Sequence, residues 1–163
     1  MDKYQHSQKD KLFKTDKTDP YLEAHRPGGS AQCPECGAKY HAGQWSWHAD
    51  ASHVSVENFV CPACRRIADR AVAGQVRLAG AFLQKHREEL VHLVRNTEAR
   101  EKAEHALERL IDVTEDGDEV LVTTTGLHLA NRIGHDLEAA YDGDTSYRYS
   151  DSEFYLSVDW RRD

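Results

Sequence analysis

The four cysteines of this 163-residue chain form two Cys-x-x-Cys pairs. The first pair is Cys33 and Cys36, and the second is Cys61 and Cys64. Thiolates are preferred ligands of zinc, and one such pair places two sulfur atoms on the same side of a tetrahedral ion. Twenty-four residues separate the pairs, enough for a hairpin that brings them together. The pattern predicts one structural Zn²⁺ bound by all four cysteines.

Residues next to the cysteines support a metal-binding turn in each pair. Pro34 and Pro62 each follow the first cysteine of a pair, and the proline ring fixes the backbone φ at that position. Gly37 permits a positive φ after Cys36. A thioredoxin-like redox role is the alternative interpretation, but the motif occurs twice and follows no strand-helix-strand pattern. Four sulfur ligands would fill the coordination shell, so we expect no catalysis at this metal.

Three histidines between the cysteine pairs are alternative ligands, since any of them can replace a thiolate. They are His41, His48 and His53. Four cysteines already suffice for a tetrahedral site, so exposed loop histidines are the simpler interpretation.

The sequence predicts an α+β protein in four parts. They are a disordered arm (1–31), a zinc ribbon (32–78), a helical connector (79–108) and an α+β domain of strand order ββαββ (109–163). The arm is polar and ends at Pro27-Gly28-Gly29-Ser30, which disfavours regular structure. The ribbon contains aromatic side chains that can form a small core around the metal: Tyr40, Trp45, Trp47 and Phe59.

The connector begins with apolar residues at helical spacing, which predict an amphipathic helix from Phe82 to Val94. Asn96 is a favourable N-cap for a second helix from Thr97 to Ala106. These two helices would join the ribbon to the last part of the chain.

The last part alternates strand and helix patterns. Leu110 to Val113 and Val120 to Thr124 read as strands around a turn at Glu115 to Asp118. Thr125 is a candidate cap for the helix that follows, and two further strands contain Tyr147 and Tyr149, then Phe154 to Trp160. We expect a small sheet with a helix across one face.

The net charge of −7 argues against a non-specific nucleic-acid binder, but the charge is unevenly distributed. The segment from Cys33 to Gly80 contains five basic and four acidic residues. The segment from Arg109 onward contains five basic and thirteen acidic residues. The ribbon is therefore the part suited to RNA. Its candidate contacts are Lys39, Trp45, Trp47, Arg65, Arg66 and Arg70. A solvated basic patch over a tryptophan-containing core is the alternative interpretation.

Other functional classes lack their sequence signatures. No apolar run is long enough to span a bilayer, and the first residues lack a signal-peptide core, so we expect a cytoplasmic protein. Glycines near Val72 and Leu78 lack the lysine of a nucleotide-binding loop. His86 with Glu89, and His128 with His135, have no accompanying nucleophile and do not predict catalysis.

Several runs together resemble a family of short bacterial zinc-ribbon proteins. The runs are the cysteine pairs, Leu78 to Leu83, Val94 to Ala99, and Val122 to Ala130. More distantly, His128-Leu129-Ala130 after Cys-x-x-Cys knuckles is similar to the N-terminal region of the archaeal and eukaryotic large-ribosomal-subunit export adaptor. That adaptor carries more cysteines and a C-terminal export region that this chain lacks. The resemblance implies a ribosome-surface or RNA-associated role.

Three functions follow from these observations as hypotheses. The first is a non-enzymatic zinc protein that binds the ribosome, in particular its large subunit or rRNA, in assembly, quality control or dormancy. The second is a protein-protein adaptor that uses the acidic C-terminal part. The third is an enzyme with a pocket near His128, His135 and Tyr155.

Overall fold

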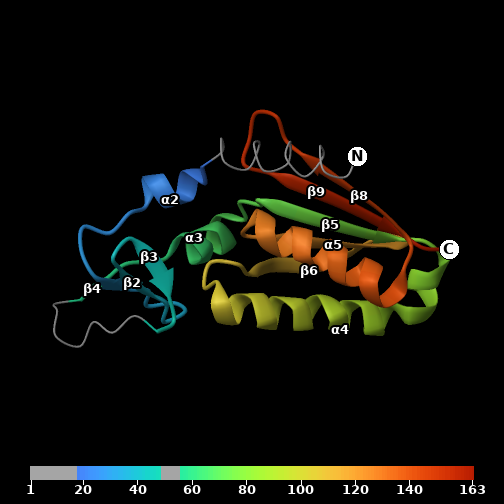
Figure 1. Cartoon of the computed structure of the whole chain (residues 1–163), viewed down its shortest axis with the longest axis horizontal. Helices are drawn as coiled ribbons and strands as arrows, with labels where there is room; N and C mark the ends of the chain where they lie inside the picture. The colour runs from blue at the N-terminus through green and yellow to red at the C-terminus, as the bar shows by residue number, and fades with distance from the viewer. Residues whose placement is uncertain (1–17, 49–55) are drawn as a thin grey trace, which may run out of the picture.

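The computed structural model describes residues 18–48 and 56–163 of the chain. Within these residues four helices and two sheets form a mixed α+β structure, which confirms the predicted class. A small ribbon sheet and a five-stranded sheet lie end to end in an elongated molecule (Figure 1). Across the described segments no helix has the length and apolar character needed to cross a membrane.

The ribbon is a four-stranded sheet followed by a short helix. Its elements are β1 (Ala31–Gln32), β2 (Lys39–His41), β3 (Gln44–Ser46), β4 (Glu57–Asn58) and α3 (Pro62–Asp69), with strand order β3-β2-β1-β4. Ala42 and Gly43 both have positive φ, the conformation of a tight hairpin turn whose twist matches the flanking strands. The hairpin predicted between the cysteine pairs is therefore present.

Residues 18–31 differ from the predicted disordered arm. They contain helix α2 (Pro20–Ala24), which Asp19 caps by accepting a hydrogen bond from the Tyr21 backbone N–H. Asp19 also forms a 2.7 Å ion pair with Arg66 of α3, and the Tyr21 hydroxyl donates to Asp69 at 2.9 Å. These bonds hold the segment against the ribbon helix, so the prediction is wrong here. Residues 1–17 lie outside the described part of the chain.

The larger domain contains five strands and two helices. Its elements are β5 (Gly74–Ala79), α4 (Ala81–Glu104), β6 (Leu110–Asp116), β7 (Glu119–Thr124), α5 (Leu127–Tyr141), β8 (Asp144–Tyr149) and β9 (Leu156–Arg161). The strand order is β6-β7-β5-β9-β8, with β5 antiparallel to β7 and parallel to β9. The sequence predicts that the residues of β5 belong to the zinc ribbon and those of α4 to a separate helical connector. In the structure both belong to the larger domain, together with the predicted ββαββ unit.

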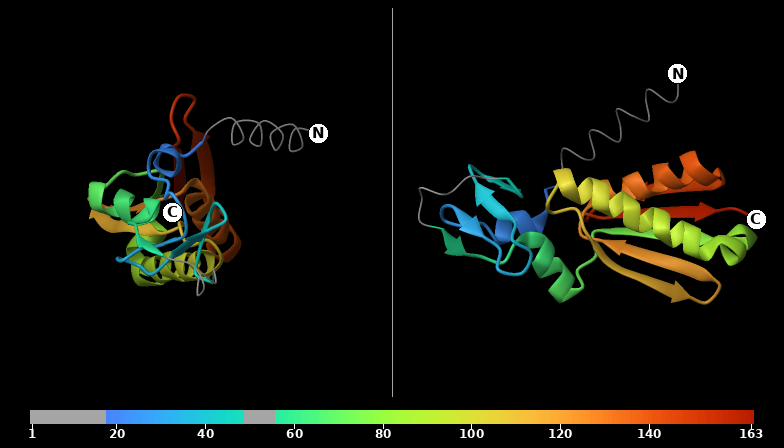
Figure 2. Two further views of the ribbon diagram at one scale, coloured as in Figure 1. Left: turned by 90° about the vertical axis from the view of Figure 1, so that its left-hand side faces the viewer. Right: turned by 90° about the horizontal axis from the view of Figure 1, so that it is seen from below.

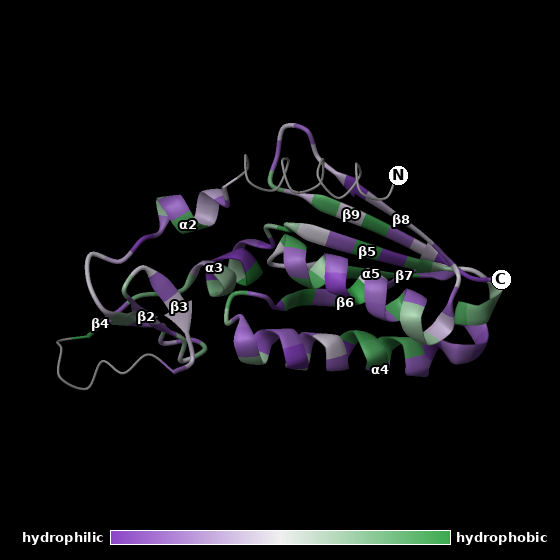
Figure 3. Ribbon diagram, in the orientation of Figure 1, coloured by the Kyte–Doolittle hydropathy of each residue, from purple (hydrophilic) through white to green (hydrophobic). Residues whose placement is uncertain are grey.

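Helices α4 and α5 cover one face of this sheet (Figures 1 and 2). Apolar residues of the strands alternate toward the helices, and the helix residues facing them are apolar too (Figure 3). The largest fully buried side chains include Trp160, Leu78, Leu83, Leu90, Leu129, Ile133 and Leu137. Trp160 donates its indole N–H to the Asp142 carbonyl at 2.7 Å, so its polar group is satisfied inside the core.

Helix α4 runs past Asn96 without interruption, so the prediction of a second helix capped there is wrong. The next residue explains why. Thr97 is fully buried, and its hydroxyl lies 2.9 Å from the Leu93 carbonyl and 2.8 Å from an Asp136 carboxylate oxygen. The helix is distorted instead at His86, whose φ of −129° is not helical.

The start of α5 is capped by a residue from another segment. Thr125 was the predicted cap, but its hydroxyl donates to the Leu107 carbonyl at 2.6 Å. The Leu129 N–H donates instead to Glu108 at 2.8 Å, and the Glu108 carboxyl fills the space that a side chain on Gly126 would need. Burial raises the pKa of Glu108, which the hydrogen bond from Leu129 opposes.

We expect Gly80→Ala to destabilise the larger domain by about 3 kcal/mol, the upper end of the cost of holding a residue in a sparsely populated backbone conformation. Gly80 has a φ of 108° between β5 and α4, and a Cβ there would collide with the backbone of Arg162. Gly117→Ala is the matched control, because its φ of 63° is also positive but its surroundings are open. That control should lose only about 1 kcal/mol in urea denaturation. Equal losses in the two variants would contradict the steric explanation.

Candidate metal centre

The four cysteines converge on one point, as the sequence predicts. Their sulfur atoms all lie within 4.8 Å of one another, and the sulfur atoms of Cys36 and Cys61 are 3.7 Å apart. Zn–S bonds of about 2.3 Å in a regular tetrahedron place neighbouring sulfur atoms about 3.8 Å apart. The cluster formed by Cys33, Cys36, Cys61 and Cys64, here called the four-cysteine cluster, therefore fits a single metal ion.

The first knuckle is a tight turn closed by backbone hydrogen bonds. The Cys33 N–H donates to the Ala38 carbonyl at 2.8 Å, and the Gly37 N–H donates to the Cys33 carbonyl at 2.9 Å. Gly37 has a φ of 83°, as predicted, because the chain reverses at this residue. The Ala38 N–H also points at the sulfur of Cys36, 3.5 Å away.

The second knuckle is the beginning of α3. Cys61 is the N-cap, and its sulfur accepts a hydrogen bond from the Cys64 N–H at 3.4 Å. Pro62 occupies the first turn, where its missing N–H costs nothing and its fixed φ suits a helix. The knuckle and the helix therefore stabilise each other.

Arg109 of the larger domain contacts the four-cysteine cluster. Only 7% of the residue is exposed, and its Nη2 lies 2.9 Å from the sulfur of Cys64. Burial raises the pKa of Cys64 to about 11, although the positive charge and hydrogen bond of Arg109 act in the opposite direction. Burial lowers the pKa of Arg109, but the neighbouring thiols outweigh it and the net shift is upward. Sequence reasoning missed Arg109, because nothing in its local pattern indicates a contact 45 residues away.

The pKa values of Cys33 and Cys61 are shifted in opposite directions. Burial opposes ionisation of Cys33, but hydrogen bonds from the backbones of Cys61, Cys36 and Glu35 lower its pKa to about 7. Burial raises the pKa of Cys61. A metal ion would favour the ionised form of each ligand thiol.

The ribbon is also tied to the end of α4. Trp47 donates its indole N–H to the Lys102 carbonyl at 2.6 Å, and the Lys102 ammonium lies 5.9 Å from the centre of the same ring. Ala106 is buried within the apolar group that surrounds the cysteines, and Leu107 packs against it. The metal centre thus lies at the junction of the two sheets.

The aromatic RNA-contact candidates are partly enclosed. Trp45 packs against Tyr40 and Phe59, with ring centres 5.2 Å and 6.3 Å away. Both Trp45 and Trp47 pack against the buried apolar group that contains Cys33, Cys61 and Cys64. These two residues therefore serve the ribbon core, as the alternative interpretation proposed.

The basic candidates are in unlike environments. Arg66 is 4% exposed, forms the ion pair with Asp19 and lies 4.3 Å from the centre of the Tyr21 ring. Arg70 has a side chain 73% exposed and is paired with Asp112 at 2.8 Å. Lys39 and Arg65 are partly buried. Arg66 is thus unable to reach a ligand, whereas Arg70 remains accessible.

Of the histidine alternatives, His41 and His48 are not part of the four-cysteine cluster. His41 lies 3.4 Å from the Ser30 hydroxyl, His48 is exposed, and His53 lies outside the described residues. His135 stacks on Tyr147, and the Tyr155 hydroxyl donates to Gln75. His135 and Tyr155 thus each have a separate partner, whereas the enzyme hypothesis needs them to line one pocket.

No known protein family matches the sequence, and neither curated proteins nor solved structures give a match.

Removal of the metal should change the ribbon and leave the larger domain folded. Trp45 and Trp47 report on the ribbon, whereas Trp160 lies in a separate apolar core. We expect a chelator to shift the fluorescence of the wild type to longer wavelength. A Trp45→Phe/Trp47→Phe variant, which retains only Trp160, should keep its emission maximum. An equal shift in that variant would mean that the two cores unfold together.

Arg109→Met should weaken metal binding by about tenfold to a hundredfold, because it removes a charged hydrogen bond to a ligand. Affinity is measured by competition with a chromophoric chelator. Arg161→Met is the matched control, since Arg161 is exposed and pairs only with nearby Asp163 in the described structure. Wild-type affinity in Arg109→Met would show that the contact does not support the ligands.

Proposed function

We propose that the four-cysteine cluster binds Zn²⁺ and that the chain is a non-enzymatic adaptor for a basic protein segment. All four ligands are thiolates, the donor set of structural zinc sites. Four protein ligands leave no coordination position for a substrate. The metal therefore has a structural role in this proposal, and partner binding belongs to the surface.

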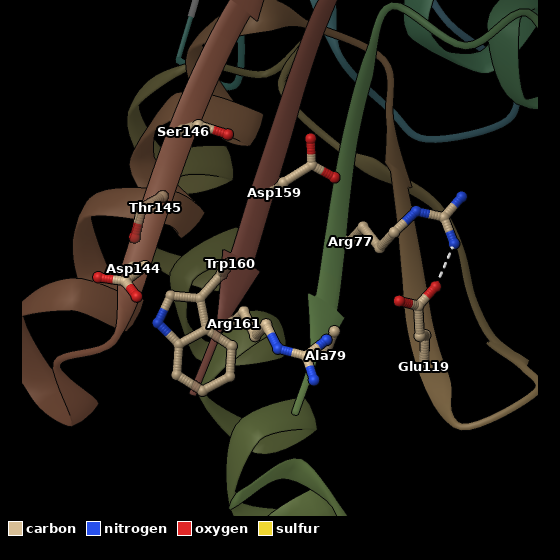
Figure 4. Close-up of a pocket in the computed structure, with 9 residues that line it drawn as sticks. All are labelled: Arg77, Ala79, Glu119, Asp144, Thr145, Ser146, Asp159, Trp160 and Arg161. Atoms are coloured by element: carbon tan, nitrogen blue, oxygen red, sulfur yellow. Dashed lines mark hydrogen bonds and ion pairs between the residues drawn. The ribbon is translucent and has the colours of Figure 1, made fainter. Parts of the chain in front are cut away.

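The observation that carries the adaptor proposal is a concentration of carboxylates at one end of the five-stranded sheet. Two adjoining hollows share Ala79, Glu119 and Arg161 and lie where β5 leads into α4. The acidic residues of these hollows, here called the acidic edge, are Asp116, Asp118, Glu119, Asp144, Asp159 and Asp163. Two arginines line the same hollows, Arg77 and Arg161 (Figure 4), and a third, Arg148, lies 3.9 Å from Asp159.

The two arginines are already neutralised. Arg77 lies 2.7 Å from Glu119 and 3.1 Å from Asp116, and Arg161 lies 3.1 Å from Asp163. The remaining carboxylates give the hollows a net negative charge, which attracts lysine- or arginine-rich segments and repels nucleic acid. The position at a sheet end, away from the metal, leaves the ribbon unaffected by binding (Figure 1).

Association with the ribosome through RNA is a second candidate function. The accessible side chain of Arg70, with Arg65 and Lys39 on the same ribbon module, favours it. Its weakness is that Arg66 is enclosed and Arg70 is paired with Asp112. A basic ribosomal protein segment would satisfy both proposals, since the partner of the acidic edge would then be part of the ribosome.

The test is recovery of partners on the immobilised full chain from nuclease-treated cell extract. An Asp118→Asn/Asp144→Asn variant should retain about tenfold less of the partner, because each removed charge weakens attraction to a basic segment. The matched control is Glu104→Gln/Asp151→Asn, which removes the same charge at exposed positions outside the acidic edge. Circular dichroism checks that both variants fold.

Two results would contradict the adaptor proposal. One is equal recovery by both double variants. The other is recovery that nuclease abolishes and that Arg70→Gln weakens, which would instead support binding through RNA. Gradient sedimentation of the tagged protein at low and moderate salt then shows whether the partner belongs to the ribosome.

A further inference from the structure

A second group of metal-type ligands converges where α4 ends and α5 begins. Glu101 lies in the last turn of α4, His105 is its C-cap, and His128 lies in the first turn of α5. Their ligand atoms all lie within 4.8 Å of one another. In the described residues, this group and the four-cysteine cluster are the two sets with that property.

The backbone holds these three side chains together. Residues four apart share one face of a helix, so Glu101 and His105 point the same way. His128 meets them from α5, with its Nε2 2.9 Å from a Glu101 carboxylate oxygen and its ring centre 5.2 Å from that of His105. The hydrogen bond from Thr125 to Leu107 fixes the two adjoining backbone segments.

We propose that Glu101, His105 and His128 form a second, exchangeable site for a divalent transition metal such as Zn²⁺. Two imidazoles and one carboxylate are borderline ligands that suit this class of ion. This proposal is independent of the adaptor function and adds a second metal to the chain.

The geometry requires only side-chain movement. Bonds of about 2.0–2.1 Å in a tetrahedral site place ligand atoms about 3.4 Å apart. His105 and His128 are exposed, with 54% of the His128 side chain accessible, so their rings can turn inward. The backbone positions of the two helices need not change.

One charge beside these three residues opposes a cation, and it can be displaced. Arg132 is the opposing charge, at 3.9 Å from Glu101, but its side chain is 48% exposed and is also paired with Asp136. A bound cation can therefore displace it toward Asp136.

This site would differ from the four-cysteine cluster in how readily it exchanges its metal. Three protein ligands leave at least one position for water, and the site is open to solvent. It lacks thiolates, so a chelator should remove its metal first. The neighbouring Lys102 contacts Trp47, which places the site beside the junction with the ribbon.

The experiment is equilibrium dialysis of the full chain against Zn²⁺, with bound zinc measured per chain by mass spectrometry. The wild type should bind two ions, and Glu101→Gln, His105→Asn and His128→Asn should each weaken the second ion by at least about tenfold while keeping the first. The matched controls are His92→Asn and His135→Asn, which change exposed histidines on the same two helices. Both controls should bind two ions.

Co²⁺ substitution separates the two sites by spectroscopy. The thiolate-to-cobalt charge-transfer band reports the four-cysteine cluster, and it should be unchanged in all three ligand variants. That band also shows that each variant is folded around its first metal. A wild type that binds only one zinc ion, or a second ion that survives His105→Asn or His128→Asn, would overturn the proposal.

Discussion

A divalent ion bound by four thiolates carries two net negative charges, and a mostly buried cluster must compensate for them. Part of the compensation comes from N–H groups of the knuckles themselves. The rest comes from the guanidinium of Arg109, a residue that belongs to the larger domain and not to the ribbon. The metal centre therefore depends on the larger domain for its electrostatic balance. The contact between the Arg109 guanidinium and the sulfur of Cys64 is one of those that join the two sheets.

Other contacts reinforce the same junction. The Thr125 hydroxyl accepts a hydrogen bond from the Arg109 N–H at 2.9 Å, which positions the backbone from which the guanidinium extends. Trp47 and Lys102 join the ribbon to α4, and Arg66 joins α3 to the segment that contains Asp19. Each contact uses a polar group that sequence reasoning had assigned to capping, to RNA or to solvent. Counts of charged residues along the chain do not show which charges are free, since many arginines are neutralised by carboxylates distant in sequence.

Local signals account for the parts that the sequence predicted well. The cysteine spacing, the positive φ of Gly37 and the alternation in β8 and β9 are properties of a few consecutive residues, so they can be read without the fold. The membership of β5 cannot be read in that way, because its partners β7 and β9 begin 45 and 82 residues later in the chain. The cap supplied by Glu108 is equally non-local, since it depends on the backbone approach that Gly126 permits. Arg109 is the clearest case, for no local pattern distinguishes it from a surface arginine.

The position of β5 has a consequence for the order in which the domain can form during synthesis. This strand leaves the ribosome before every other strand of its sheet, yet its parallel neighbour is β9, whose residues are 156–161. Until those residues emerge, one edge of β5 has no partner and the apolar residues that meet Trp160 remain uncovered. The ribbon contains all four cysteines by residue 64 and can bind its metal much earlier. The nascent chain would then carry a folded ribbon next to an unfinished sheet, and Arg109 would complete the metal centre only as the later strands arrive.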